Sequence, residues 1–150
     1  MNAARSPELV ALARDRGLDD DPNVRQALAD LHIHESIRGF MAQRIRVAVA
    51  AGRVPGPEGS LAKLTGSLLA RRVRDVAVAV LGPEVQAWED GTAGSEPAER
   101  WSTFCISAAG ISIAGGTDEV QRNIIGERVL GLPKEPDPFK GAAWLDVPRS

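Results

Sequence analysis

The 150-residue sequence is poor in the features that mark several functional classes. Its single cysteine, Cys105, excludes a disulfide within the chain. Its two histidines, His32 and His34, would point to diverging faces of a helix, and no other cluster of cysteine or histidine could complete a metal site. No apolar run approaches the roughly 18 residues of a membrane-spanning helix, and residues 1–6 lack the pattern of a signal peptide. We therefore expect a cytoplasmic protein without a metal site.

A strong charge of either sign is also missing. The formal net charge is −2 and the isoelectric point is near 5.7, which argues against a nucleic acid or an anionic membrane as partner. Glycine-rich nucleotide loops and the nucleophile motif of serine hydrolases are absent. Hydrophobic residues make up 43% and charged residues 25% of the chain, so at this length we expect one globular domain.

The sequence does contain a series of helical patterns separated by glycine and proline. Ser6 and Asp21 each precede a proline and are suited to cap a helix, and Gly17, Gly52 and Gly82 are suited to end one. We expect helices over residues 6–17, 22–52, 60–81, 97–111 and 118–130, with a loop over residues 86–96. The second helix should run through the apolar residues Val24, Leu28, Leu31, Ile37, Phe40, Met41, Ile45 and Ala48. The third should point inward with Leu61, Leu64, Leu68, Leu69, Val73, Val76 and Val80.

These patterns predict an all-α fold, an antiparallel four-helix bundle with an extra short helix at the N-terminal end. Residues 1–150 would form one domain, with an irregular tail over residues 134–150. Phe139, Trp144 and Leu145 are candidate groups for docking that tail on the helices.

One segment combines a glycine hinge with a helix start. Gly115 and Gly116 permit a sharp turn, and Thr117 is a good N-cap. A helix start after glycine can also hold an anion on its free N–H groups. Asp118 and Glu119 oppose an anion, however, so the residues alone favour a plain helix start over a phosphate site.

The remaining polar groups do not indicate a specific function. Arg71, Arg72 and Arg74 form a basic cluster that we expect to be solvated, or to pair with acidic groups of another subunit. Cys105 falls on the apolar stripe of its helix, which predicts an inert buried thiol. On residue chemistry alone the chain is a helical bundle of unassigned function.

The segment from Gly115-Gly116-Thr117 to Pro133 resembles the C-terminal signature of the acyl-CoA dehydrogenases. Weaker matches in the same order extend the resemblance over about residues 9–135: Leu28-Ala29-Asp30-Leu31, Ala50-Ala51-Gly52-Arg53, Pro55-Gly56-Pro57-Glu58, Ala62-Lys63-Leu64 and Leu81-Gly82-Pro83. The chain is similar only to the C-terminal helical domain of that family, without the N-terminal helical and middle β-domains.

The resemblance implies an oxidoreductase that removes two hydrogens from an acyl-CoA, with a carboxylate base taking the α-proton and FAD taking the β-hydride. It implies that Gly115, Gly116, Thr117 and Glu119 lie at the flavin. Many members have a glutamate base at the position of Gly115, where glycine offers no proton acceptor. Many also have a glutamine and a second glycine where this chain has Ala79 and Pro83, at a contact with a neighbouring subunit's FAD.

Three interpretations remain open at this stage. The chain could be the C-terminal part of an acyl-CoA dehydrogenase that is inactive alone and completed by another chain. It could be a non-catalytic helical module for oligomerisation or interaction. It could also be a truncated remnant of a longer protein. In the first two cases we expect a homo- or hetero-oligomer, with acyl-CoA dehydrogenase-like chains in the first.

Overall fold

The computed structural model describes residues 5–54, 56–86, 96–136 and 138–148. Its helices are α1 (Ser6–Asp15), α2 (Pro22–Ala50), α3 (Glu58–Leu81), α4 (Glu96–Ile111) and α5 (Asp118–Arg128), with short 3₁₀ helices η1 (Gly82–Val85) and η2 (Trp144–Asp146). These residues contain no strand, so the all-α prediction is confirmed. Most of the loop predicted over residues 86–96 lies outside the described residues.

The helix starts follow from local chemistry, with two corrections. Asp21 caps α2 as predicted, because its carboxylate accepts hydrogen bonds from the backbone N–H groups of Asn23 and Val24 at 2.8 and 3.0 Å. Ser6 is not a cap: it is the first residue of α1, and its hydroxyl donates to Glu35 on α2 at 2.5 Å. Helix α3 begins at Glu58 rather than Ser60, since an acidic first turn suits a helix N-terminus.

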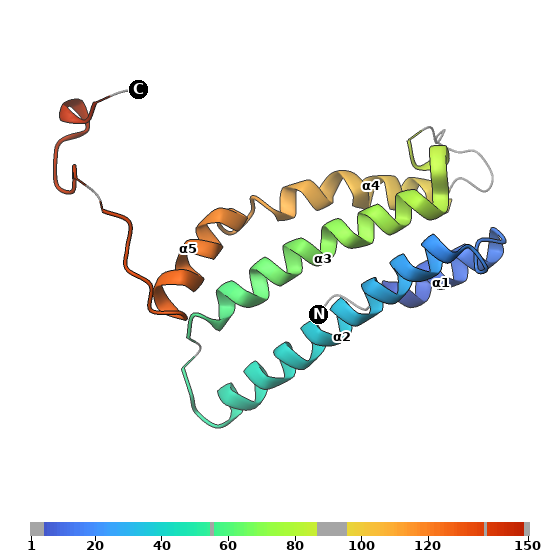
Figure 1. Ribbon diagram of the computed structural model, residues 1–150, viewed down its shortest axis with the longest axis horizontal. Coiled ribbons are helices and arrows are strands. Elements are labelled where there is room, and N and C mark those ends of the chain that lie inside the picture. The colour runs from blue at the N-terminus through green and yellow to red at the C-terminus, as the bar shows by residue number, and fades with distance from the viewer. Residues whose placement is uncertain (1–4, 55, 87–95, 137, 149–150) are drawn as a thin grey trace.

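Helix α3 is the centre of the fold and contacts α1, α2, α4 and α5 (Figure 1). Helix α1 runs antiparallel to α2 and reaches α4 through an ion pair between Glu8 and Arg100. At this end the four helices α1 to α4 enclose a core built around the fully buried Leu9, Leu31, Leu81 and Trp101. All four helices contribute apolar side chains to this core. The removal of these side chains from water is the main contribution to the stability of the domain.

Beyond Leu31, helix α2 does not bury the side chains that its sequence suggests. Ile37 and Phe40 belong to the apolar pattern of this helix, yet they are 49% and 66% exposed. The face of α2 that carries Val24, Leu28 and Leu31 continues through Arg38 and Ala42 instead, because those positions repeat at helical spacing. On α3, Val73, Val76 and Val80 are buried as predicted, whereas Leu61, Leu64, Leu68 and Leu69 are only half-buried.

The chain after α5 extends away from the helices (Figure 1). Leu145 is 83% exposed and Phe139 is 42% exposed, so the predicted docking of Leu145 on the bundle is wrong. The side chain of Trp144 lies outside the described part of the chain. No helix in the described ranges is both long enough and apolar enough to cross a bilayer.

Candidate functional site

The glycine hinge has the conformation that its residues predict. Gly115 and Gly116 have φ angles of +67° and +94°, in the region that favours glycine. Thr117 has extended backbone, and its hydroxyl oxygen accepts a hydrogen bond from the Val120 N–H at 3.3 Å. Thr117 is therefore the N-cap of α5, as expected. Because capping uses only a lone pair, the hydroxyl hydrogen of Thr117 can still be donated to a ligand.

A side chain on α5 is hydrogen-bonded to the backbone of the hinge. The amide nitrogen of Gln121 donates to the carbonyl oxygen of Gly115 at 3.1 Å. A Cβ added at Gly116 would come within 2.8 Å of that nitrogen, whereas a Cβ at Gly115 would meet nothing within 4 Å. Both glycines are thus favoured by their backbone angles, and a side chain at Gly116 would in addition displace the flexible Gln121 amide.

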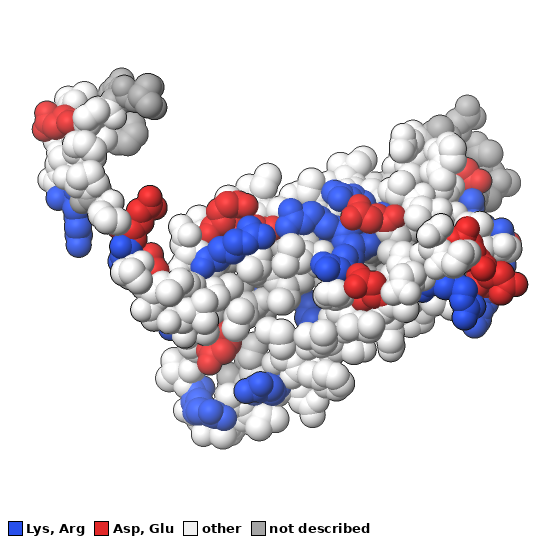
Figure 2. Space-filling model, in the orientation of Figure 1, with Lys and Arg blue, Asp and Glu red and all other residues white. Residues whose placement is uncertain are grey.

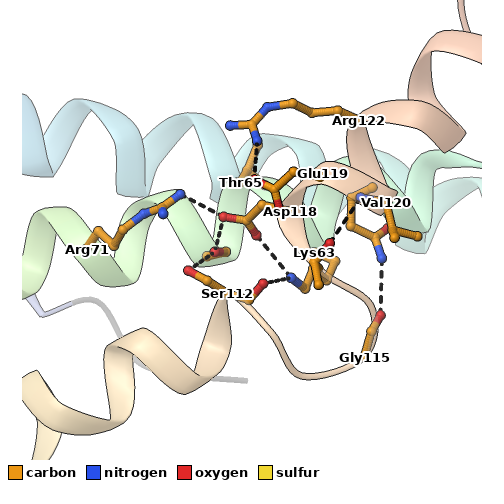
Figure 3. A network of polar contacts seen from close by, with 12 residues as sticks. Lys63, Thr65, Arg71, Ser112, Gly115, Asp118, Glu119, Val120 and Arg122 are labelled. Atoms are coloured by element: carbon orange, nitrogen blue, oxygen red, sulfur yellow. Dashed lines mark hydrogen bonds and ion pairs between the residues drawn. The ribbon is translucent and has the colours of Figure 1, made fainter. Parts of the chain in front are cut away.

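The residue after the cap anchors the hinge to α3. Asp118 is only 2% exposed, and its carboxylate accepts hydrogen bonds from Lys63 at 3.0 Å, Ser67 at 2.9 Å and Arg71 at 2.7 Å (Figure 3). Ser112, at the end of α4, joins the same network through a 3.0 Å hydroxyl contact with Ser67. One buried carboxylate therefore fixes the relative positions of α3, α4 and α5.

The network keeps Asp118 ionised. Burial by itself would raise the pKa of Asp118, but hydrogen bonds from Ser67 and Lys63 and the charges of Lys63 and Arg71 outweigh it and hold the pKa below its usual range. A general base needs a pKa near the working pH and a lone pair directed at its substrate. Asp118 has neither, so it cannot replace the carboxylate that is missing at Gly115.

The basic cluster on α3 is paired within the chain. Arg71 binds Asp118, Arg72 binds Asp30 at 3.0 Å, and Arg74 binds Asp75 at 2.8 Å. Basic and acidic groups alternate over this face in Figure 2. The three arginines are partly exposed, as expected of a solvated face, and each also has an acidic partner within the chain. Pairing with another subunit stays a prediction.

The sequence did contain a signal for the Asp118 network. Lys63, Ser67 and Arg71 are spaced by four residues along an otherwise apolar stretch, which places them on one face of α3. A polar stripe within an apolar helix needs buried partners. Its partner, Asp118, could not be identified from the sequence because it is 47 to 55 residues away.

The other predicted site residue is more exposed. Glu119 projects from the first turn of α5 and pairs with Arg122 at 3.4 Å (Figure 3). A shallow depression of about 550 Å³ lies beside the hinge, between the start of α3 and α5. Its lining includes Gly115, Lys63, Gln121 and Arg128 but not Gly116, Thr117 or Glu119. The structure thus brings only Gly115, of the four predicted residues, to this depression.

The Gly82 region lies far from the hinge. Lys63 marks the hinge end of α3 and Gly82 follows its other end, so about 28 Å of helix separates them. Gly82 has a φ of +62°, and Ala79 is exposed. The two regions therefore cannot form one compact site within a single chain.

Two other side chains behave as ordinary structural groups. Cys105 is half-buried, and burial raises the pKa of its thiol. His34 contacts the carbonyl oxygen of Asp30 at 2.9 Å. In the described parts of the chain, no group of three or more histidine, cysteine, aspartate or glutamate side chains is placed to hold a metal ion.

Comparison with known proteins identifies the class of protein to which this helical bundle and its glycine hinge belong. The model of the family "Acyl-CoA dehydrogenase, C-terminal domain" matches residues 6–130. The chain therefore belongs to the acyl-CoA dehydrogenase family, through its C-terminal domain.

Particular relatives fall in the same group. The chain is 34% identical over 134 residues to acyl-CoA dehydrogenase IpdE1 of Mycolicibacterium smegmatis, covering 89% of this chain and 31% of the relative. The IpdE1 of Mycobacterium tuberculosis is 31% identical over 133 residues, with 85% and 31% covered. The chain thus spans about a third of the length of these curated relatives.

Solved structures agree on the fold. The Tcur3481-Tcur3483 steroid ACAD has a TM-score of 0.76 at 22% identity, over 87% of this chain and 34% of the other. The ChsE4-ChsE5 complex from Mycobacterium tuberculosis has a TM-score of 0.67 at 26% identity, over 91% and 37%.

Proposed function

We propose that this chain is the C-terminal helical part of an FAD-dependent acyl-CoA dehydrogenase that is assembled with another chain of the same family. The carrying observation is the family match over residues 6–130, together with a glycine hinge at Gly115, where the resemblance places a glutamate base in many members. Residues 1–150 form a single domain in this proposal. The likeness to the ChsE4-ChsE5 complex, at 26% identity, supports a partner chain.

The fit to a flavin is partial. Gly115 and Gly116 add no side chains of their own at the hinge, and Thr117 retains a hydroxyl hydrogen to donate. The depression beside Gly115 is open and shallow, and in our proposal a partner chain supplies its remaining walls. Bound FAD would supply the hydride acceptor. In this chain, Gly115 and Gly116 would let the backbone come close to the flavin, and Thr117 and Glu119 would make polar contacts with it.

The chain alone should have no dehydrogenase activity, because no side chain at Gly115 can take the α-proton and Asp118 is fully engaged by cations. The test compares the purified chain with its complex with an acyl-CoA dehydrogenase-type partner, using acyl-CoA, FAD and an artificial electron acceptor. Turnover by the chain alone would refute the inactivity. A complex that forms but holds no flavin would refute the site.

The matched variants for that test are Thr117→Val and Thr117→Ser in the complex. Valine keeps the shape of threonine but loses both the cap and the donated hydrogen, whereas serine keeps both. We expect flavin content to fall with valine and to be retained with serine. Equal flavin content in both variants would remove Thr117 from the site.

A second function has its own observation. Ile33, Ile37, Phe40 and Val47 leave an exposed apolar stripe on the outer face of α2. Such a stripe favours a helical module for oligomerisation without catalysis. A helical, oligomeric chain that retains no flavin with any acyl-CoA dehydrogenase-type partner would favour this alternative.

We also place the protein in the cytoplasm, on the evidence of its single cysteine.

A further inference from the structure

The peptide group that joins Gly115 and Gly116 can turn over without moving the rest of the chain. Such a turn reverses ψ of the first residue and φ of the second, and it leaves the Cα atoms almost in place. Both residues are glycine, with φ angles of +67° and +94°, and glycine adopts positive and negative φ about equally readily. The backbone by itself therefore does not determine which way this peptide group faces.

The direction of this peptide group decides what the hinge offers to a ligand. No peptide bond in the described chain is cis, so the carbonyl oxygen of Gly115 and the N–H of Gly116 point to opposite sides. With the carbonyl directed inward, the outer side of the hinge carries a hydrogen-bond donor. With the peptide turned over, the same side carries an acceptor.

The hinge also has donors that the fold does not use. On either side of it, the N–H groups of Ala114 and Asp118 donate to backbone carbonyl oxygens at 2.9 and 3.1 Å. Between them, the N–H groups of Gly115, Gly116 and Thr117 have no acceptor in the described part of the chain. These three donors remain available to a ligand.

Gln121, in the first turn of α5, contacts the hinge peptide directly. Its side chain is only 6% exposed, and its amide nitrogen donates to the Gly115 carbonyl oxygen at 3.1 Å, the bond that ends at Gly115 in Figure 3. If the peptide turned over, this bond would be lost and the amide nitrogen would face the N–H of Gly116. Two donors facing each other inside the fold are unfavourable, so Gln121 favours the inward carbonyl.

The surroundings of Gln121 keep its amide nitrogen, rather than its amide oxygen, on the side of the hinge. Lys63 and Arg128 line the depression beside Gln121, and no acidic side chain is among the described residues that line it. Lys63 uses two of its three N–H groups on Ser112 and Asp118, and Arg128 has no ion pair in the described chain. Positive groups on that side attract the amide oxygen and leave the nitrogen for Gly115.

We infer that Gln121 is a positioning residue for the flavin site. It holds the hinge peptide with the Gly116 N–H on the outer side, where that N–H donates to an electron-rich atom of the flavin. A donor there stabilises the negative charge that a flavin gains on reduction, so it raises the reduction potential. Gln121 acts through the backbone and does not itself touch the flavin. This inference rests on the proposed function for the identity of the ligand.

NMR spectroscopy of the isotope-labelled 150-residue chain tests the positioning itself. The native chain should show a scalar coupling across the hydrogen bond from the Gln121 amide to the Gly115 carbonyl. Gln121→Leu removes the donor, and we expect the turned-over population to rise about tenfold, as the loss of one hydrogen bond predicts. Relaxation dispersion at the Gly116 amide measures that exchange. Gln121→Glu offers only acceptors at neutral pH, so the turned-over peptide should become the major form.

A control and the spread of the changes separate positioning from a structural role. Asn123→Ala, at an exposed position of the same helix, should leave the Gly115 and Gly116 resonances unchanged. The Val120 amide, which is bound by the N-cap, should keep its resonance in both Gln121 variants. Unchanged Gly116 resonances in both variants would overturn the inference. Changes spread evenly along residues 117–128 would also overturn it, because Gln121 would then only support the helix.

The effect on the cofactor is measured in the complex with an acyl-CoA dehydrogenase-type partner, by spectroelectrochemical titration of bound FAD. We expect the reduction potential to fall from the native chain to Gln121→Leu and further to Gln121→Glu, with Asn123→Ala equal to native. Equal potentials in all four complexes would overturn the assignment of this N–H to the flavin. The NMR measurements need neither flavin nor partner. Their failure is therefore distinct from failure of the proposed function, which would appear as a complex without flavin.

Discussion

Arg71 on α3 and Asp118 on α5 approach to 2.7 Å and join two helices whose residues are 47 positions apart in the sequence. Lys63 and Ser67 bind the same carboxylate from the two preceding turns of α3. The glycine hinge lies directly before Asp118, so this network determines where the hinge is held. The position of the predicted cofactor residues therefore depends on a buried ion pair.

Replacing Asp118 tests that dependence. Asp118→Asn leaves Lys63 and Arg71 without their counter-charge, and we expect a loss of about 3 kcal/mol in the free energy of unfolding. Urea denaturation measures it. Asp75→Asn is the matched control: Asp75 pairs with Arg74 at an exposed site, and its loss should cost less than about 1 kcal/mol. Equal effects of the two substitutions would contradict the structural role of Asp118.

The stabilisation by Asp118 should also depend on pH. Its pKa is lower in the folded chain than in the unfolded chain, where an aspartate has a pKa of about 3.9. The unfolded state therefore takes up the proton first as the pH falls. The stability difference between the native chain and Asp118→Asn should be constant above about pH 5 and shrink progressively below about pH 4. Urea midpoints at a series of pH values measure it, and a difference that grows on acidification would contradict the prediction.

The two hinge glycines should respond differently to alanine. Gly116→Ala adds backbone strain and forces the Gln121 side chain to move, whereas Gly115→Ala adds strain alone. We expect losses of about 2–3 kcal/mol and about 1–2 kcal/mol, respectively. Thermal unfolding compares them. Adding Gln121→Ala should reduce the difference between the two glycine variants; an unchanged difference would show that Gln121 is not its cause.

The exposed stripe on α2 predicts self-association of the isolated chain. The double substitution Ile37→Gln and Phe40→Gln removes apolar surface that is already exposed, so it should lower the association constant and change the stability of the fold little. Sedimentation equilibrium measures the association. Leu31→Ala, in the same helix but fully buried, should instead cost about 2–5 kcal/mol of stability. A double variant that associates as strongly as the native chain would exclude this stripe from the contact.

Cys105 should react slowly with alkylating reagents. Burial raises the pKa of its thiol, so the thiolate fraction at pH 7 is smaller than that of a free cysteine. Iodoacetamide labelling followed by mass spectrometry should give a lower rate for the folded chain than for the chain in urea. A faster rate in the folded state would identify Cys105 as an activated thiol, against its interpretation as an inert group.

The sequence determined the local structure of this protein. Helix starts at Asp21 and Thr117, the positive φ angles at Gly115 and Gly116, and the burial of Val73, Val76 and Val80 all follow from capping, glycine freedom and helical spacing. These depend on interactions between residues a few positions apart. The acyl-CoA dehydrogenase signature is local in the same way, so the family was recognisable without a structure.

Only the tertiary structure decided which charges and apolar groups have partners. From the sequence alone, Asp118 is an ordinary acidic residue in the first turn of a helix, and Arg71 is a solvated cation. Only the packing of α5 against α3 pairs the two. Ile37 and Phe40 fit the helical spacing of a core, yet α2 turns Arg38 and Ala42 inward. The physical reason is that burial depends on how neighbouring helices are placed. That placement is set by contacts across tens of residues, which a periodic pattern does not encode.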